Sequence, residues 1–263
     1  MIILIVTHGR EGNVKTAQQI PQSWRSQTYI VHGPNEKHTD LLEAGFQLLK
    51  TPRGVADSIA EKRQWLCNWS QDRYVYMMDD DLAFYARDYD NLMPKGYPRL
   101  RRSSMSEMNR LLRQTRKDLF TYPLVGVGRR FMNFSRPPIR YNTYVESNYS
   151  IDLEVLKRHR IRFDDADFGQ DQHVALSLVE AGYTIIFRSD WAVGHPQMGA
   201  NPGGCSLTRT VERVINSNRI LHELHPATVK IIEEPGYRNH AGLLTNQRYT
   251  IDWKLAVKIG DGA

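Results

Sequence analysis

Three adjacent acidic residues, Asp79, Asp80 and Asp81, have the clearest chemical use in this sequence. They follow Tyr74–Met78, a run of large apolar residues that predicts a buried β-strand. Adjacent carboxylates repel one another unless a positive group lies beside them. Carboxylate oxygens suit hard cations such as Mg²⁺ or Mn²⁺, and open α/β sheets bind ligands beyond the carboxyl ends of their strands. The triple therefore predicts a divalent-metal and phosphate site, with a solvated acidic loop tip as the alternative.

Alternating strands and helices are expected to position this site. In the first half the pattern predicts strands at Ile2–Val6, Tyr29–Val31, Leu48–Lys50 and Tyr74–Met78, and helices at Val14–Trp24 and Gly54–Trp69. This order is typical of a mainly parallel, layered α/β sheet. In the second half it predicts helices at Met105–Leu119, Ile151–Arg158, Phe168–Ala181 and Ser206–Leu221, strands at Leu124–Gly128, Thr184–Arg188, Val229–Ile232 and Thr250–Trp253, and a loop at Phe131–Tyr141.

Length and composition restrict the class of protein. The chain has 263 residues and a mass of 30.5 kDa, which suits one α/β domain. Hydrophobic residues make up 41% and charged residues 24%, which excludes a wholly disordered chain. The apolar runs are too short for a transmembrane helix, so we expect no membrane anchor. Two cysteines exclude a disulfide framework or a four-cysteine zinc site, and a cytoplasmic location is expected.

The positive charge is concentrated in one segment. The whole chain has a formal net charge of +6, and residues 95–117 contain eight basic residues and one acidic residue. A local basic patch favours a polyanionic partner, although it is also compatible with a solvated helix face.

The stretch 53–63, followed by Tyr74–Leu82, resembles the donor-binding region of the GT-A class of nucleotide-sugar glycosyltransferases. In that class a D-x-D or D-D-D motif follows a hydrophobic strand. The resemblance spans residues 1–196. It implies one α/β domain of GT-A fold over residues 1–263, with a nucleotide-sugar-binding half (1–90) and an acceptor-binding half with a C-terminal extension (91–263). It also implies transfer of a sugar from a nucleotide sugar, with a UDP-sugar as the expected donor and Mn²⁺ or Mg²⁺ as the cofactor.

The same resemblance assigns roles to the acidic triple. The last acid, Asp81, would bind the metal directly, and Asp79 would contact the ribose or a metal-bound water, with Asp80 also in the donor site. A histidine after the Thr184–Arg188 strand, His195, would be a second metal ligand, with His240 as the competitor. The other expected donor contacts are Thr7, His8 and Arg10 at the nucleoside, Arg53 at the diphosphate, and Gly203 and Gly204 in a loop that closes over the donor.

An acid at the start of the Phe168–Ala181 helix matches the position of the general base in this class. By that match Asp171 would take the proton from the acceptor hydroxyl, and the sugar would be transferred with inversion. Asp164, Asp165 and Asp167 lie nearby and stay open as alternatives.

Basic residues with interleaved aromatic residues suggest how an acceptor is held. Such a pattern suits a nucleic-acid backbone and an extruded base. The compact, basic layout resembles the TET/JBP-associated glycosyltransferases of bacteriophages, which implies DNA carrying 5-hydroxymethylcytosine or a related hydroxymethylpyrimidine as acceptor. The expected DNA contacts are Arg99, Arg101, Arg102, Arg110, Arg113, Arg129, Arg130, Phe131, Phe134 and Arg136.

Three alternatives stay open. A cell-surface polysaccharide or lipopolysaccharide acceptor would keep the fold and the reaction. A nucleotidyltransferase would usually have a Gly-rich loop with Arg and Lys after the first strand, whereas the loop here contains only Gly9 and Gly12. A non-catalytic DNA-binding module would leave the acidic triple unexplained. The sequence does not give the oligomeric state.

Overall fold

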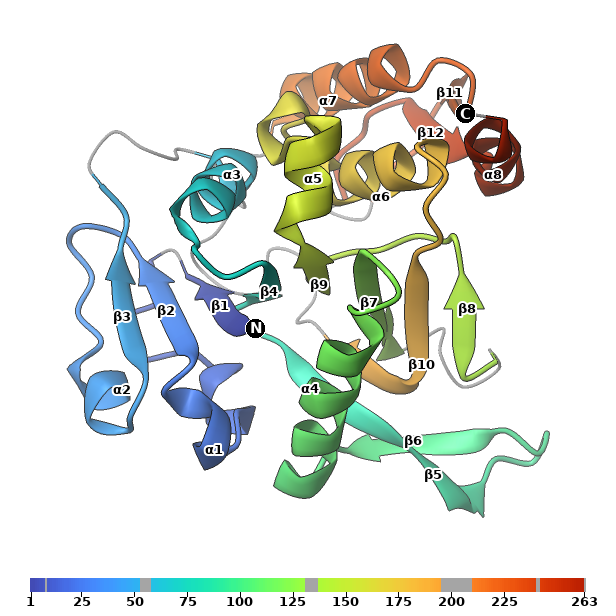
Figure 1. Cartoon of the computed structure of the whole chain (residues 1–263). Helices are drawn as coiled ribbons and strands as arrows, with labels where there is room; N and C mark the ends of the chain where they lie inside the picture. The colour runs from blue at the N-terminus through green and yellow to red at the C-terminus, as the bar shows by residue number, and fades with distance from the viewer. Residues whose placement is uncertain (8, 53–57, 131–136, 195–209, 240–241, 263) are drawn as a thin grey trace.

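The computed structural model describes every residue except 8, 53–57, 131–136, 195–209, 240–241 and 263. Within the described residues, ten strands form one mixed sheet and two more form a small separate sheet (Figure 1). The large sheet contains β1 (Ile2–Val6), β2 (Thr28–His32), β3 (Gln47–Lys50), β4 (Tyr74–Asp79), β5 (Ala83–Leu92), β6 (Pro98–Arg102), β7 (Leu124–Arg129), β8 (Ile139–Tyr141), β9 (Asn148–Asp152) and β10 (Ile186–Gly194). The small sheet pairs β11 (Val229–Glu233) with β12 (Gln247–Ile251).

The strands of the large sheet have the order β3-β2-β1-β4-β9-β7-β10-β5-β6, and β8 pairs with β10. The β3-β2-β1-β4 half is parallel throughout, and β7 is parallel to β10. β9, β5 and β8 run against their neighbours. Most strands therefore point the same way, as the alternation of strands and helices predicts.

Helices cover both faces of the sheet. Figure 1 shows α3, α5 and α6 on one side and α1 and α4 on the other. The α-helices are α1 (Gln22–Arg25), α2 (Thr39–Glu43), α3 (Ile59–Trp69), α4 (Met105–Asp118), α5 (Leu153–His159), α6 (Gln170–Glu180), α7 (Val211–Leu224) and α8 (Trp253–Asp261), and the described 3-10 helices are η1 (Ala17–Gln19) and η3 (Phe163–Asp165).

Strand β1 shows how the two layers form. Its side chains alternate, so Ile2, Leu4 and Val6 join the core under α3, α5 and α6, whereas Ile3 and Ile5 join the core under α1 and α4. Every residue of β1 is buried. A continuous apolar strand is required here because both faces of the sheet are covered.

Local signals fix the two longest early helices. Ser58 and Ser104 are the N-caps of α3 and α4, and each forms a reciprocal capping box with a glutamate, Glu61 and Glu107. Each box pairs two backbone donors that the helix itself cannot satisfy.

Several expected elements differ in the structure. The helix predicted at Val14–Trp24 is divided into η1 and α1, because Pro21 cannot continue a helix and instead is the N-cap of α1. The helix predicted from Ile151 begins only after β9, whose residues are all buried between β4 and β7. The β5-β6 hairpin, β8 and α8 were not predicted. None of the helices in the described part of the chain is long and apolar enough to cross a bilayer.

Candidate active site

The acidic triple lies at the carboxyl end of β4, in the middle of the large sheet. Asp79 is the last residue of β4 and is in register with Val6 at the end of β1. The Thr16 hydroxyl donates to the Asp79 carbonyl (2.7 Å) and accepts from the Leu82 backbone N–H (2.9 Å). The Gln19 side-chain amide donates to the Leu82 carbonyl (2.7 Å). The backbone of the first acid and of the residue after the triple is therefore held by Thr16 and Gln19, which the sequence analysis did not single out.

Arg10 neutralises part of the triple. Its Nη1 atom lies 2.7 Å from Asp80 Oδ1 and 2.6 Å from Asp81 Oδ2. Burial raises the pKa of Asp80 to about 7, against the opposing effects of Arg10 and the Thr7 hydroxyl. Thr7 is buried, and its carbonyl accepts a hydrogen bond from the Lys62 ammonium (3.2 Å). Arg10 and Thr7, both predicted at the donor site, thus do lie against the acidic triple.

Arg63 joins the triple to the predicted base. Its side chain on α3 is 2% exposed, and its guanidinium forms ion pairs with Asp79 (3.0 Å) and with Asp171. Asp171 lies in the first turn of α6, whose N-cap, Gly169, has a φ of +105° that favours glycine. Its Oδ1 also accepts from the Tyr149 hydroxyl (2.8 Å). Two acids separated by more than ninety residues therefore share one buried cation, and Arg63 is a site residue that the sequence analysis missed.

The remaining bond to Asp171 comes from the backbone. Ser147 N–H donates to Asp171 Oδ2 (3.0 Å), and the Ser147 carbonyl accepts from Asp79 N–H (3.2 Å). Tyr144 and Tyr249 lie close enough for Asp171 to affect them. Burial raises the pKa of both tyrosines, the Asp171 charge adds to this rise, and Arg129 opposes it. Tyr144 and Tyr249 are therefore two tyrosines of the acceptor half whose pKa responds to the charge of Asp171.

The carboxylates of the site outnumber the guanidinium groups that pair with them. Four carboxylates (Asp79, Asp80, Asp81, Asp171) face two guanidinium groups. Oxygen ligands of this kind fit Mg²⁺ or Mn²⁺. Among the described residues, however, no group of three His, Cys, Asp or Glu side chains is placed to hold a metal ion. Adjacent carboxylates need a positive group beside them. Among the described residues, Arg10 and Arg63 form ion pairs with the acids of the triple.

Strand β10 leads the chain back to the acidic triple. Gly194, its last residue, is in register with Ala83, two residues after Asp81. His195, predicted as a second metal ligand, lies outside the described residues. The other expected site residues outside the described ranges are His8, Arg53, Phe131, Phe134, Arg136, Gly203 and Gly204, together with the competitor His240.

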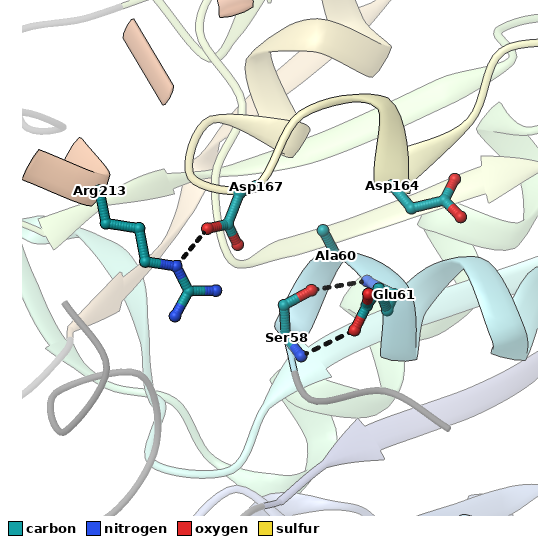
Figure 2. Close-up of a pocket in the computed structure, with 6 residues that line it drawn as sticks. All are labelled: Ser58, Ala60, Glu61, Asp164, Asp167 and Arg213. Atoms are coloured by element: carbon teal, nitrogen blue, oxygen red, sulfur yellow. Dashed lines mark hydrogen bonds and ion pairs between the residues drawn. The ribbon is translucent and has the colours of Figure 1, made fainter. Parts of the chain in front are cut away.

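The other acids considered for the base are separate from Arg63. A cavity of about 300 Å³ lies between α3, the η3 segment and α7. It is lined by Ser58, Ala60, Glu61, Asp164, Asp167 and Arg213 (Figure 2). Asp167 is held there by Arg213 (2.6 Å), and Asp164 pairs with Arg162 (2.6 Å). Asp171 is the acid of this cluster that shares a cation with Asp79.

The basic residues expected at the acceptor are spread over several elements. Arg99, Arg101 and Arg102 lie on β6, Arg110 and Arg113 on α4, and Arg129 and Arg130 at the end of β7. Some already have partners. Arg101 pairs with Glu107 (2.8 Å), Arg110 lies over the Trp191 ring (5.4 Å), and Arg129 pairs with Glu146. Arg102 and Arg130 both lie over the ring of Tyr85.

Comparison with solved structures places the fold. No protein-family model and no curated protein matches the chain. Its structure matches the crystal structure of S. aureus TarS 1-349 in complex with UDP-GlcNAc with a TM-score of 0.52 at 8% identity, over 85% of this chain and 66% of that chain. It also matches the mannosyltransferase PcManGT from Pyrobaculum calidifontis in complex with GDP-Man and Mn²⁺, with a TM-score of 0.53 at 12% identity, over 99% of this chain and 72% of that chain.

The chain has the GT-A fold. Identities this low show the fold alone, and the chain spans less than two thirds of the TarS structure. The fold class predicted from the sequence is confirmed. In this GT-A sheet the acidic triple lies where open α/β sheets bind their ligands, beyond the carboxyl ends of the parallel strands.

Proposed function

We propose that this protein is a glycosyltransferase that moves a sugar from a nucleotide sugar to a hydroxyl acceptor. The observation that carries the proposal is the bridge in which Arg63 joins Asp79, at the end of β4, to Asp171, at the start of α6. The bridge brings a donor-side acid and a candidate base together at the ligand-binding edge of a GT-A sheet. Two solved structures of this fold hold UDP-GlcNAc and GDP-Man, which supports a nucleotide-sugar donor and leaves the nucleotide open.

The donor side is proposed to bind Mn²⁺ or Mg²⁺ through Asp81 and His195, with Asp79 beside them. Such an ion supplies positive charge where the departing diphosphate becomes negative. The carboxylate oxygens of the site support this assignment. Arg10 holds Asp80 and Asp81 in place and adds a guanidinium fork of the kind that suits phosphate oxygens. Thr7 lies in the same loop, at the end of β1.

Asp171 is proposed as the general base. Oδ1 accepts hydrogen bonds from Arg63 and Tyr149, whereas Oδ2 accepts one described hydrogen bond, from Ser147 N–H. A carboxylate oxygen has two lone pairs, so Oδ2 is the atom that would take the proton from the acceptor hydroxyl. The acceptor oxygen would then displace the nucleotide directly, which inverts the configuration of the sugar.

The acceptor that we propose is 5-hydroxymethylcytosine, or a related hydroxymethylpyrimidine, in DNA. Its support is the basic character of β6, α4 and the end of β7, which suits a phosphate backbone. A base that reacts must leave the stacked duplex, at a cost of a few kcal/mol. Phe131 and Phe134, which lie outside the described residues, are the aromatic residues proposed to stack on the extruded nucleobase.

A donor assay tests the reaction. A panel of UDP- and GDP-sugars is incubated with the protein and Mn²⁺, and release of the nucleotide is measured with and without EDTA. We expect release with Mn²⁺, its loss with EDTA, and its loss in Asp81→Asn. Asp40→Asn, an exposed acid on α2, is the matched control and should behave as wild type. Release that survives both EDTA and Asp81→Asn would refute the metal role.

An acceptor assay tests the DNA proposal. Labelled sugar is offered with duplexes that do or do not contain 5-hydroxymethylcytosine. Incorporation only into the hydroxymethylated duplex is expected, because only that duplex presents the attacking oxygen. No incorporation into either duplex, together with transfer to a surface polysaccharide or lipopolysaccharide, would move the assignment to that acceptor.

A further inference from the structure

Two arginines share one tyrosine ring beside the candidate active site. The Arg130 guanidinium lies 4.4 Å and the Arg102 guanidinium 5.1 Å from the centre of the Tyr85 ring. Arg130 also donates to the Tyr85 hydroxyl (3.2 Å). Both arginines are exposed, and neither forms an ion pair with a carboxylate of the described residues. The two guanidinium groups carry the same charge and repel each other. An anion bound between them would reduce this repulsion.

Each arginine is connected to one side of the candidate site. Arg102 approaches Gln19 (3.4 Å), whose amide holds the carbonyl of Leu82, next to Asp81. On the other side, Arg129, the residue before Arg130, pairs with Glu146. The residue after Glu146, Ser147, donates its backbone N–H to Asp171. Each arginine is thus linked, through neighbouring residues, to one side of the proposed reaction centre.

The close packing of β10 fixes the ring. A Cβ on Gly194 would lie 3.0 Å from Tyr85 Cε2 and 3.7 Å from Arg130 Cδ, which is tight contact. Stacking on a fixed ring orients a guanidinium and leaves its planar edge of N–H donors for an oxyanion. Phosphate oxygens match that fork better than a single carboxylate oxygen does.

We infer that Arg102 and Arg130, stacked on Tyr85, bind phosphodiester groups of the acceptor. This inference rests on the proposed function, since it gives the chemical class of the molecule that brings the hydroxyl. The ring sets the direction of the two forks, and the acceptor chain would run past Tyr85 toward Asp171.

A binding experiment tests the inference with two probes of equal charge. One is a fluorescent twelve-residue oligothymidylate, and the other is a phosphodiester chain of the same length without bases. Affinity is measured by anisotropy at several salt concentrations for wild type and for the double variant Arg102→Gln/Arg130→Gln. Lys254→Gln/Lys258→Gln removes the same charge from exposed residues of α8, outside β6, α4 and β7, and is the control. Thermal unfolding checks that each variant is folded.

We expect the Arg102/Arg130 variant to bind both probes about tenfold more weakly. The slope of log affinity against log salt should become shallower by about 1.4, as expected for two lost contacts to a single strand. An equal loss in the control variant would overturn the inference, because it would show general charge attraction. Loss for the oligothymidylate alone would also overturn it, because the arginines would then contact bases.

The donor assay separates this inference from the proposed function. Wild-type protein that binds both probes through Arg102 and Arg130 but releases no nucleotide with any donor would keep the phosphate site and refute the glycosyltransferase. Wild-type protein that releases nucleotide but binds the probes independently of the two arginines would support the glycosyltransferase and refute the phosphate site.

Discussion

Replacing Arg63 with methionine removes the cation that two acids share while keeping a long apolar side chain. The Arg63 side chain is 2% exposed and that of Asp171 is 9% exposed, so Asp171 would lose its cation in a largely water-free environment. Breaking a buried ion pair in this way costs roughly 3–5 kcal/mol. The pair with Asp79 adds at most about 1 kcal/mol, because the Asp79 side chain is 32% exposed and water screens it. We therefore expect the free energy of unfolding to fall by roughly 3–5 kcal/mol, together with loss of nucleotide-sugar turnover.

Urea unfolding at pH 7 measures the first effect, at a temperature at which every variant is folded. A double-mutant cycle with Asp171→Asn separates the pair from other effects, and a coupling of about 1–3 kcal/mol is expected for groups in direct contact. The matched control is Arg188→Met, because Arg188 is also buried and forms a two-bond ion pair with Asp118 (2.6 and 2.9 Å). It should lose comparable stability but keep turnover.

Two results would refute this reasoning. A fall of less than about 1 kcal/mol in Arg63→Met would mean that the bridge is not a buried ion pair in solution. An equal loss of turnover in Arg188→Met would mean that activity follows stability alone, and that Arg63 has no particular place in the site.

Three further predictions concern α6 and its neighbours. Asp171→Asn should retain nucleotide-sugar binding but slow transfer by about 10²–10⁴-fold, since an amide cannot take up the proton; an unchanged rate would return the role to another acid of the cluster. Burial and His225 lower the pKa of His173 from 6.5 to about 4. As the pH drops from about 6.5 to about 4, this histidine is therefore protonated in the unfolded chain before it is protonated in the folded protein, and the free energy of unfolding falls. His173→Asn should flatten this dependence in urea titrations, and an identical pH slope would contradict the assignment. A Cβ on Gly260 would overlap a carbonyl oxygen of α6, so Gly260→Ala should lower the free energy of unfolding in urea by roughly 1–3 kcal/mol. Gly262→Ala is the control, because its Cβ would have its nearest contact at 3.6 Å and should cost little. Equal losses in the two variants would refute close packing of α8.

Predicting the positions of Asp79, Asp80 and Asp81 from sequence was possible because a strand and its end are local features. A continuous apolar run can only be a buried strand or helix, and the three acids after it cannot continue into the core. The same reasoning gave β1, α4, β7 and α6 close to their observed bounds. Together with the family resemblance, these elements were enough to predict the fold, which the structural comparison confirms.

The contacts around these residues were decided by the tertiary structure. Arg63 and Asp171 are 108 residues apart and meet because α3 and α6 pack on the same face of the sheet. No local sequence pattern predicts the contact between Arg63 and Asp171, because the sequence of each helix alone indicates only an ordinary amphipathic or buried segment. For the same reason the last two residues of β9, Ile151 and Asp152, were predicted as the start of a helix. Its hydrogen bonds go to β4 and β7, which are distant in sequence, so only the assembled sheet distinguishes a buried strand from the start of α5.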